Sequence, residues 1–361
     1  MAKNVSQASS PAGWIDNRLR NLHRREFISI LGAGVLGGVF SSRARPASQK
    51  VGAKALRGIF PIAQTPFTDS NQLDLNALAR QVEFIDRGGV HGFVWPQMAS
   101  EYSTLSKSER MGGAETIVAT GKRLHPAIVI GVQAPDVTTA VAYARHAAKI
   151  GADAIISLPP ANANDPDVVL EYYREVGRAT DLPLIAQTVG NMSVELVVRM
   201  SKAVPTLRCV KDEAGGSPLG RIGSLREQTA DKLRVFTGSH GRTLIDEMQR
   251  GSSGCMPAAS FADIYAAVWD LWHKGQHQEA MDLFGKALLF ITEVEAYGIQ
   301  SLKYLLYLRG VFATYAVRVK DSGAPLDESA KKTLRDIARF ANPYFKCCPV
   351  GSALNKGESH G

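Results

Sequence analysis

The most constraining feature of this sequence is an alternation that begins at Leu56, in which short apolar runs rich in β-branched residues are followed by longer stretches with helical spacing. Eight such strand–helix units follow one another before Gly275. The expected strands are 58–63, 92–95, 127–131, 154–158, 183–187, 207–211, 233–237 and 254–256. The expected helices are 75–87, 106–120, 137–150, 167–179, 194–203, 219–229, 243–250 and 263–274. Eight consecutive units predict an α/β fold, a closed parallel (β/α)8 TIM barrel over residues 56–275, rather than an open doubly wound sheet.

Beyond Gly275 the pattern becomes entirely helical. Three further helices are expected over 278–294, 299–308 and 326–340. They predict a C-terminal helical extension of the barrel over 276–345, followed by a flexible tail over 346–361. The extension could pack on the barrel flank or form an oligomer contact, and the pattern does not choose between these two arrangements.

The first fifty residues have the pattern of a targeting segment. Arg24 and Arg25 precede a glycine-rich apolar run that ends near Phe40, and this run is too short for a comfortable membrane span. The arrangement resembles a bacterial twin-arginine export signal. We therefore expect residues 1–50 to be a signal and leader that the twin-arginine export machinery recognises, so that the mature protein acts in the periplasm or outside the cell. An uncleaved amphipathic or disordered leader is the alternative.

Composition limits the partners of the chain. The formal net charge is +8, but part of the excess lies in the leader, and the remainder contains no basic block with interleaved aromatic residues. Nucleic-acid binding is therefore not expected, and an anionic substrate is weakly favoured. The cysteines have no metal-ligand spacing, so no metal site is predicted. Cys209 and Cys255 lie in apolar runs as buried thiols, whereas Cys347 and Cys348 are adjacent near the C-terminus.

One lysine lies at the position along the sequence where a barrel usually carries its catalytic residues. Reacting groups collect at the C-terminal ends of barrel strands, and Lys211 ends the expected sixth strand after an apolar run. Burial there disfavours the charged ammonium form, and attack on a carbonyl needs the neutral amine. From position alone, Lys211 could equally be a surface lysine that begins a loop beside Asp212 and Glu213.

A resemblance to a known family favours the catalytic interpretation. The segment 209–215, CVKDEAG, resembles the G-I-K-E-A-T-G segment of the dihydrodipicolinate synthase / N-acetylneuraminate lyase family, which consists of class I Schiff-base aldolase barrels. Segments 62–67, 105–110 and 251–257 follow in that family's order and spacing. The resemblance implies that Lys211 is the Schiff-base lysine, that no cofactor is needed, and that the protein is a homo-oligomer, a dimer or a tetramer.

The same resemblance nominates the residues that would hold the substrate. These lie at the ends of the first, second, fifth and eighth expected strands: Thr65, Gln97, Ser100, Glu101, Gln187 and Met256. The second loop departs from the family pattern G-T-T-G-E, because Met98 and Ala99 occupy the two threonine positions. The pocket for the substrate carboxylate must therefore differ from that of the family.

A second departure concerns proton transfer. The family's fourth strand ends in P-Y-Y and its second tyrosine relays protons, but Ala161 occupies that place here. His240, in the loop after the seventh strand, could replace the relay because its ordinary pKa suits proton transfer near neutral pH. A polar loop role for His240 is the alternative. Glu101 is expected to be a buried carboxylate that organises the loop after the second strand rather than the base of the relay. Tyr102 is a weaker candidate for the relay, and a bound water is another.

The leading hypothesis is therefore a Schiff-base-forming lyase, an aldolase or a hydro-lyase, that acts on pyruvate or a related small 2-oxo acid through Lys211. The lost tyrosine, the lost threonines and the expected export argue against dihydrodipicolinate synthase itself. One alternative is a catalytically degenerate barrel that binds a small-molecule solute outside the cytoplasm. Another, a metal-dependent aldolase barrel, lacks a cluster of His, Asp and Glu ligands in the sequence.

Overall fold

The computed structural model describes residues 54–161, 164–215, 219–319 and 323–351, and these residues cluster into one compact unit. The predicted signal and leader over 1–50 lie outside the described residues. None of the helices in the described residues combines the length and the apolarity that crossing a membrane requires.

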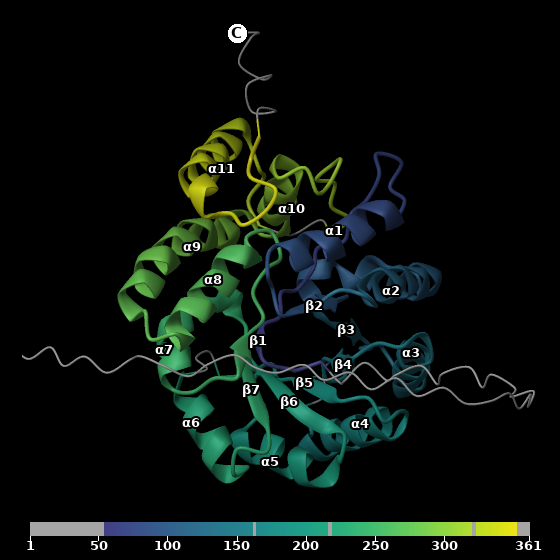
Figure 1. Cartoon of the computed structure of the whole chain (residues 1–361). Coiled ribbons are helices and arrows are strands. Elements are labelled where there is room, and N and C mark those ends of the chain that lie inside the picture. The colour runs from purple at the N-terminus through teal and green to yellow at the C-terminus, as the bar shows by residue number, and fades with distance from the viewer. Residues whose placement is uncertain (1–53, 162–163, 216–218, 320–322, 352–361) are drawn as a thin grey trace, which may run out of the picture. The chain divides into compact units, whose positions relative to one another are not determined.

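The described residues form a parallel sheet of eight strands in the order β1-β8-β7-β6-β5-β4-β3-β2 (Figure 1). Ile62, just beyond β1, bridges in parallel to both Val94 of β2 and Ala258 beyond β8, and these bridges close the sheet. The predicted (β/α)8 TIM barrel is therefore confirmed. The strands are β1 (Gly58–Ile59), β2 (Gly92–Trp95), β3 (Ala127–Gly131), β4 (Ala154–Ser157), β5 (Leu184–Gln187), β6 (Leu207–Asp212), β7 (Arg234–Thr237) and β8 (Gly254–Cys255).

Helices follow each strand and surround the sheet in Figure 1. Their ends agree with the predicted ranges to within about one residue, a smaller difference than the usual disagreement between methods that assign helix ends. The helices are α1 (Leu75–Arg87), α2 (Lys107–Gly121), α3 (Val137–Ile150), α4 (Pro166–Arg178), α5 (Val194–Ala203), α6 (Leu219–Gln228), α7 (Leu244–Gln249) and α8 (Ala262–His273).

Local capping explains where several helices begin. The side chain of Asp74 accepts a hydrogen bond from the Ala77 N–H at 2.9 Å, which satisfies one of the unpaired donors at the start of α1. Ser106 and Glu109 form a reciprocal capping box at the start of α2. Ser106 is thus the cap of this helix rather than its first residue, and the helix runs one residue later than predicted.

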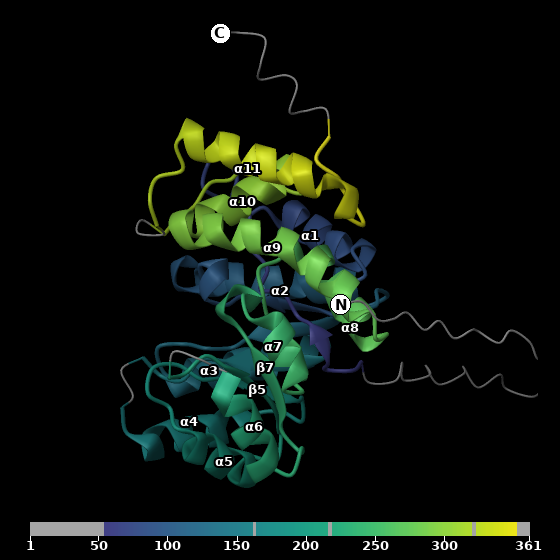
Figure 2. The same ribbon diagram turned by 90° about the vertical axis from the view of Figure 1, so that its left-hand side faces the viewer.

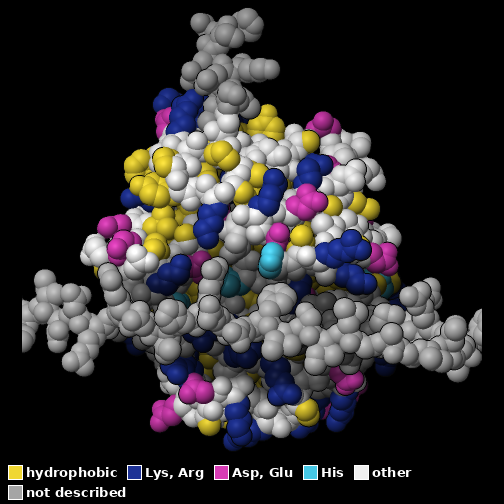
Figure 3. All heavy atoms as spheres, in the orientation of Figure 1, with side chains coloured by type: hydrophobic (Ala, Val, Ile, Leu, Met, Phe, Trp, Pro, Cys, Tyr) yellow, Lys and Arg dark blue, Asp and Glu magenta, His cyan; other side chains and the backbone are white. Residues whose placement is uncertain are grey.

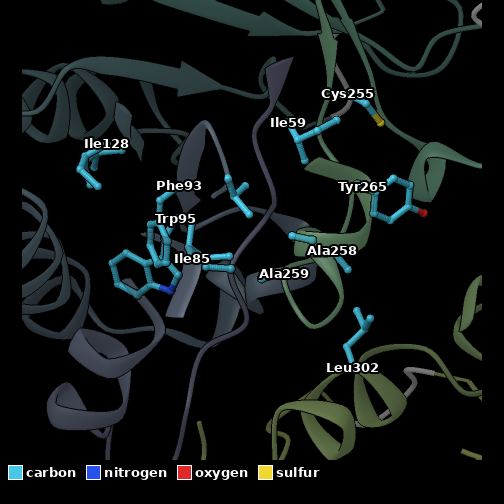
Figure 4. Close-up of a cluster of buried hydrophobic side chains, with 14 of the residues drawn as sticks. Ile59, Ile85, Phe93, Trp95, Ile128, Cys255, Ala258, Ala259, Tyr265 and Leu302 are labelled. Atoms are coloured by element: carbon cyan, nitrogen blue, oxygen red, sulfur yellow. The ribbon is translucent and has the colours of Figure 1, made fainter. Parts of the chain in front are cut away.

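The core has two layers because successive strand residues point to opposite faces of the sheet. Val94 belongs to the cluster that fills the barrel interior. Its neighbours Phe93 and Trp95 belong to the larger cluster between sheet and helices, part of which is drawn in Figure 4. Ile62 and Met256 lie in the interior cluster at the C-terminal end of the barrel, where they reappear below as part of a cavity wall.

The C-terminal extension packs on the barrel. It consists of α9 (His277–Tyr297), α10 (Ile299–Leu308) and α11 (Glu328–Ala341). Helix α9 contacts α8, and the three helices of the extension contact one another (Figure 2). Helix α9 therefore packs on the barrel flank, which is one of the two arrangements that the sequence leaves open.

An apolar surface remains on the extension. Hydrophobic side chains gather over α9 and α11 on the face shown in Figure 3. The large exposed apolar residues of these two helices are Met281, Leu288, Leu289 and Phe340. Homo-oligomer formation stays a prediction, and this surface is compatible with it.

Residues just beyond the extension also contact the barrel. The buried guanidinium of Arg309 donates to both carboxylate oxygens of Asp263, at 3.0 and 2.7 Å, and to the carbonyl of Cys347 at 2.6 Å. The Lys346 N–H donates to the same carboxylate at 3.1 Å. These contacts place residues 346 and 347 against the barrel, although the sequence pattern predicts a flexible tail from residue 346.

A buried ion pair joins the extension to the loop that follows β2. Glu101 and Lys303 pair with side chains that are 0% exposed. The Glu101 carboxylate also accepts the N–H groups of Arg318 and Val319 at 2.6 and 2.9 Å, and Lys303 donates to the carbonyl of Ala316 at 2.7 Å. Burial lowers the pKa of Lys303 to about 8, although Glu101 acts in the opposite direction. Each charge therefore depends on its partner.

We expect Lys303→Met to lower the free energy of unfolding by about 3–5 kcal/mol, because it leaves the Glu101 carboxylate buried without a cation. The double variant Glu101→Gln/Lys303→Met should recover part of this loss, since an amide can still accept the two N–H groups. Denaturant unfolding measures both effects. Lys332→Met, which breaks an exposed pair with Asp336, is the control and should cost less than about 1 kcal/mol. Strictly additive losses at Glu101 and Lys303 would contradict this interpretation.

Candidate active site

A cavity of about 380 Å³ lies at the C-terminal ends of the strands, where a barrel of this kind places its reacting groups. Residues from the ends of six strands and the loops that follow them line it: Ile62, Gln97, Met98, Ala99, Gln187, Val189, Gly190, Lys211, Glu213, Ser239, His240, Met256, Pro257 and Ala258. Most of this wall is apolar, and its charged side chains are a lysine and a glutamate. Among the described residues, no group of three or more His, Cys, Asp and Glu side chains could hold a metal ion.

Lys211 lies on β6, in register with Gln187 of β5 and Phe236 of β7. Its side chain is 7% exposed, and its Nζ is 2.9 Å from Oε2 of Glu213. In an extended strand, residues two apart point to the same face, so Lys211 and Glu213 reach the same cavity. The site therefore contains an amine and a carboxylate within hydrogen-bond distance of each other.

Three donors hold the Glu213 carboxylate. Besides Lys211, the Gln187 amide donates to Oε2 at 2.5 Å and the Ser239 N–H donates to Oε1 at 2.8 Å. Burial by itself would raise the pKa of Glu213, but the Lys211 ammonium and the bonds from Ser239 and Gln187 outweigh it and lower the pKa below its ordinary value. Glu213 is therefore an anion at neutral pH.

A hydrogen-bonded layer supports the turn that carries Glu213. The Thr188 hydroxyl accepts the N–H groups of Glu213 and Ala214 at 2.9 and 3.1 Å and donates to Asp212 at 2.7 Å. Asp212 is 0% exposed and accepts two hydrogen bonds from Arg221, at 2.7 and 3.0 Å. Because each buried polar group in this layer has a partner, the backbone that follows Lys211 is held in one conformation.

The loop after β7 contributes Ser239 and His240 to the cavity wall. Ser239 and His240 both have positive φ, at 47° and 56°, a conformation that is uncommon for residues other than glycine and is often found at functional sites. Burial lowers the pKa of His240, the Lys211 ammonium lowers it further, and Glu213 opposes them. The imidazole is thus mainly neutral at pH 7 and can accept a proton.

Five of the predicted site residues come together at the cavity: Lys211, His240, Gln97, Gln187 and Met256. Thr65, Ser100 and Glu101 do not line it. Thr65 accepts a hydrogen bond from the Trp95 indole at 2.9 Å and donates to the carbonyl of Ser100 at 2.5 Å.

The polar atoms of the other two residues are also used within the protein. The Ser100 hydroxyl bonds to the carbonyl of Ala63 and accepts the Gln97 N–H at 3.0 Å, and Glu101 pairs with Lys303. Thr65, Ser100 and Glu101 therefore shape the loop after β2, and the substrate contact predicted for them stays a prediction.

Neither Ala161 nor Tyr102 lines the cavity. Ala161, at the position of the family's relay tyrosine, therefore supplies no proton-transferring group to the cavity. The proposed substitute Tyr102 does not supply one either. The residue that the sequence analysis did not nominate is Glu213. It stands where the family segment G-I-K-E-A-T-G has alanine, and its spacing of two from Lys211 was the signal that could have identified it.

Comparison with known proteins adds independent information. The sequence pattern of the dihydrodipicolinate synthetase family matches residues 55–341. The chain is 30% identical over 210 residues to 4-hydroxy-tetrahydrodipicolinate synthase of Methanosarcina acetivorans, covering 56% of this chain and 70% of that protein. It is 26% identical over 299 residues to L-2-keto-3-deoxyarabonate dehydratase of Azospirillum brasilense, covering 80% and 95%. The crystal structure of dihydrodipicolinate synthase from Rhodopseudomonas palustris superposes with a TM-score of 0.72 at 25% identity, covering 78% and 97%.

The packing around Gly238 gives a test of the site geometry. A Cβ at this position would lie 1.9 Å from Oε1 of Glu213, so Gly238→Ala must displace the carboxylate from Lys211 and Ser239. We expect the free energy of unfolding to fall by about 1–3 kcal/mol, because buried donors lose their acceptor. Denaturant unfolding and a crystal structure of the variant check this.

The matched control is Gly223→Ala in α6, where an added Cβ meets nothing within 4 Å. This variant should be more stable by about 0.5–1 kcal/mol, since alanine favours a helix interior over glycine. A Gly238→Ala structure that keeps the Lys211–Glu213 pair would refute the packing argument.

Proposed function

This chain belongs to the dihydrodipicolinate synthetase family and is a lyase, and on that basis we propose that Lys211 forms a Schiff base with the ketone of pyruvate or a related small 2-oxo acid. The observation that carries the proposal is that Lys211 lines the cavity at the end of β6 with the Glu213 carboxylate 2.9 Å from its Nζ. The Schiff base would then serve either carbon–carbon bond cleavage and formation or the elimination of water.

The first step requires that the amine lose a proton. A lysine side chain is ordinarily an ammonium at neutral pH, and the Nζ atom of Lys211 lies 2.9 Å from the Glu213 carboxylate. A neutral amine is the nucleophile that attacks a ketone. Glu213 is the nearest acceptor for that proton. The amine adds to the carbonyl carbon, and a proton passes from its nitrogen to the new alkoxide oxygen to give the carbinolamine. The protonated Glu213 can then donate its proton to the carbinolamine hydroxyl, which leaves as water as the nitrogen lone pair forms the iminium.

The second step uses the iminium as an electron sink. Removal of a proton from C3 gives an enamine, and expulsion of a hydroxyl group from C4 with a proton then eliminates water. Alternatively, removal of the proton from a C4 hydroxyl breaks the C3–C4 bond. Both routes need a base and an acid beside the iminium, and Glu213 and the neutral His240 are the groups in the cavity wall that can exchange protons.

We therefore assign to Glu213 the proton transfer that the tyrosine, absent here, performs in the family. Glu101 is committed to Lys303, and Tyr102 does not line the cavity. His240 takes the second proton-transfer role. Its loop also supplies the Ser239 N–H that holds Glu213 at 2.8 Å, so the two candidate groups are held by one segment.

The relatives favour the lyase over a degenerate solute-binding barrel. The L-2-keto-3-deoxyarabonate dehydratase matches along most of its length, which supports the elimination of water as one of the possible reactions. Export to the periplasm and assembly as a homo-oligomer remain proposals that rest on the twin-arginine-like residues Arg24 and Arg25 and on the family. A solute-binding barrel would have no need of the Lys211–Glu213 pair.

Borohydride reduction in the presence of pyruvate tests the Schiff base. We expect the protein to gain the mass of reduced pyruvate at Lys211, because hydride reduces the iminium to a stable secondary amine. Lys211→Met should give no adduct, and Lys332→Met, at an exposed lysine, should react like the unaltered protein. Intact mass and peptide mapping provide the measurement. Absence of an adduct across a panel of 2-oxo acids, or an adduct that persists in Lys211→Met, would rule the mechanism out.

The pH dependence of the reaction tests the role of Glu213. Protonation of Glu213 removes the base, and its pKa is lowered. His240 also titrates in the cavity wall, so the profile is measured in His240→Gln. In that variant kcat/KM should be maintained as the pH falls to the ordinary glutamate value of about 4.3 and should decline only below it. Glu213→Gln should lower kcat by about 10²- to 10⁴-fold and abolish that decline. Samples returned to neutral pH before assay control for unfolding. A decline centred above the ordinary glutamate value would contradict the assignment.

A further inference from the structure

A second cavity lies beside the candidate active site. Its volume is about 500 Å³, and it shares Val189 and Gly190 with the wall of the first cavity. The other residues of its wall belong to the loops after β4 and β5 and to the first turns of α4 and α5. The two cavities are therefore neighbours at the C-terminal ends of the strands, and Val189 and Gly190 form a ridge between them.

This ridge is held next to Lys211. Thr188, the residue before it, donates its N–H to the carbonyl of Lys211 at 2.9 Å. The carbonyl of Gly190 accepts the Gly215 N–H at 2.9 Å, which fixes the ridge to the turn that follows β6. Gly190 has a φ of 55°, and a Cβ built on it would meet nothing within 4 Å. A ligand held at Lys211 can therefore extend across the backbone of Gly190 into the second cavity.

The side chains that line the second cavity are uncharged in the part of the chain that the structure describes. Those that carry polar groups are Asn164, Asn191 and Ser193, and the Ser193 hydroxyl already accepts the Leu196 N–H at 3.1 Å as the cap of α5. Rings of proline and aliphatic side chains bind apolar groups by removing apolar surface from water. Besides Val189, the apolar residues of the wall are Pro159, Pro160, Pro166, Val169, Met192 and Leu196.

An ionised group would gain no counter-ion from this wall. Burial of an ion without a partner costs more than burial of an uncharged group. Asp167 and Glu195, in the first turns of α4 and α5, add negative charge outside the wall, and Arg199 is already paired with Asp167 at 2.5 Å. An anionic group is therefore especially disfavoured in the second cavity.

From this arrangement we propose that the second cavity binds the far end of a 2-oxo acid whose chain beyond C3 ends in an uncharged alkyl or aryl group. The ketone end lies at Lys211, the chain crosses Gly190, and the end group packs against the prolines of the wall. The proposal rests on the proposed Schiff base at Lys211. It adds a substrate class, a 2-oxo acid that occupies both cavities and carries no charge at its far end.

Three acids provide the test: 2-oxooctanoate, 2-oxooctanedioate of the same chain length, and pyruvate as the short reference. The measurement is the concentration of each acid that half-saturates borohydride trapping at Lys211. Each methylene that leaves water should lower this concentration about 3- to 4-fold. We therefore expect 2-oxooctanoate to half-saturate at a concentration at least about 10-fold below that of each other acid. A difference of less than about 3-fold from either acid would overturn the proposal.

Variants of Asn191 assign the preference to the second cavity, because this exposed residue lines that cavity and not the first. Asn191→Trp fills the cavity and should reduce the ratio of pyruvate to 2-oxooctanoate half-saturation by about 10-fold. Asn191→Lys adds a cation and should shift the preference toward 2-oxooctanedioate by about 3-fold. Asn76→Trp, at an exposed position on α1, is the matched control and should leave both ratios unchanged.

Unchanged ratios in both Asn191 variants would mean that the chain lies elsewhere and would overturn the proposal. The comparison of the three acids needs no variant, and pyruvate separates this proposal from the proposed function. If pyruvate is trapped at Lys211 and 2-oxooctanoate is not preferred, the proposal for the second cavity fails and the proposed function stands. If none of the three acids is trapped, both proposals fail.

Discussion

The closure of the sheet at its first strand decides where the other parts of the structure lie. Ile62 bridges to Val94 on one side and to Ala258 on the other, so the eight parallel strands share a single rim at their C-terminal ends. Residues as far apart in the chain as Gln97, Lys211 and His240 reach one cavity because of this closure. An open sheet with the same strands would separate the first strand from the last.

Within that rim, the chemistry depends on a balance of charge. Lys211 and Glu213 form an ion pair, and each supplies the opposite charge that a largely buried ion needs. The amides of Gln187 and Ser239 keep Glu213 an anion, and burial keeps His240 mainly neutral. The free site therefore holds one proton donor and two proton acceptors beside the place where the ketone must lie.

Local sequence signals predict much of this fold. The helices α1, α3 and α5 begin and end where the sequence indicates, because each has a capping Asp or Ser and a regular apolar period. Lys211 could be identified because the end of a barrel strand and the resemblance point to the same residue. Glu213 was missed because the family segment has alanine at that position.

Contacts between residues far apart in the sequence could not be predicted from such local signals. Thr65, Ser100 and Glu101 have the residue types of substrate ligands, but their partners include a tryptophan on β2 and the distant Lys303. No local pattern around Glu101 indicates a pairing with a residue two hundred positions later.

The pairing of Glu101 with Lys303 also has a consequence for how this chain acquires its structure. Strand–helix units contact their neighbours and can associate soon after they are synthesised, whereas the loop after β2 needs Lys303 and the N–H groups of Arg318 and Val319. Contacts across such a separation form late and slow folding. On a ribosome, the barrel wall can assemble early, and the rim of the cavity gains its final shape only when nearly the whole chain has emerged.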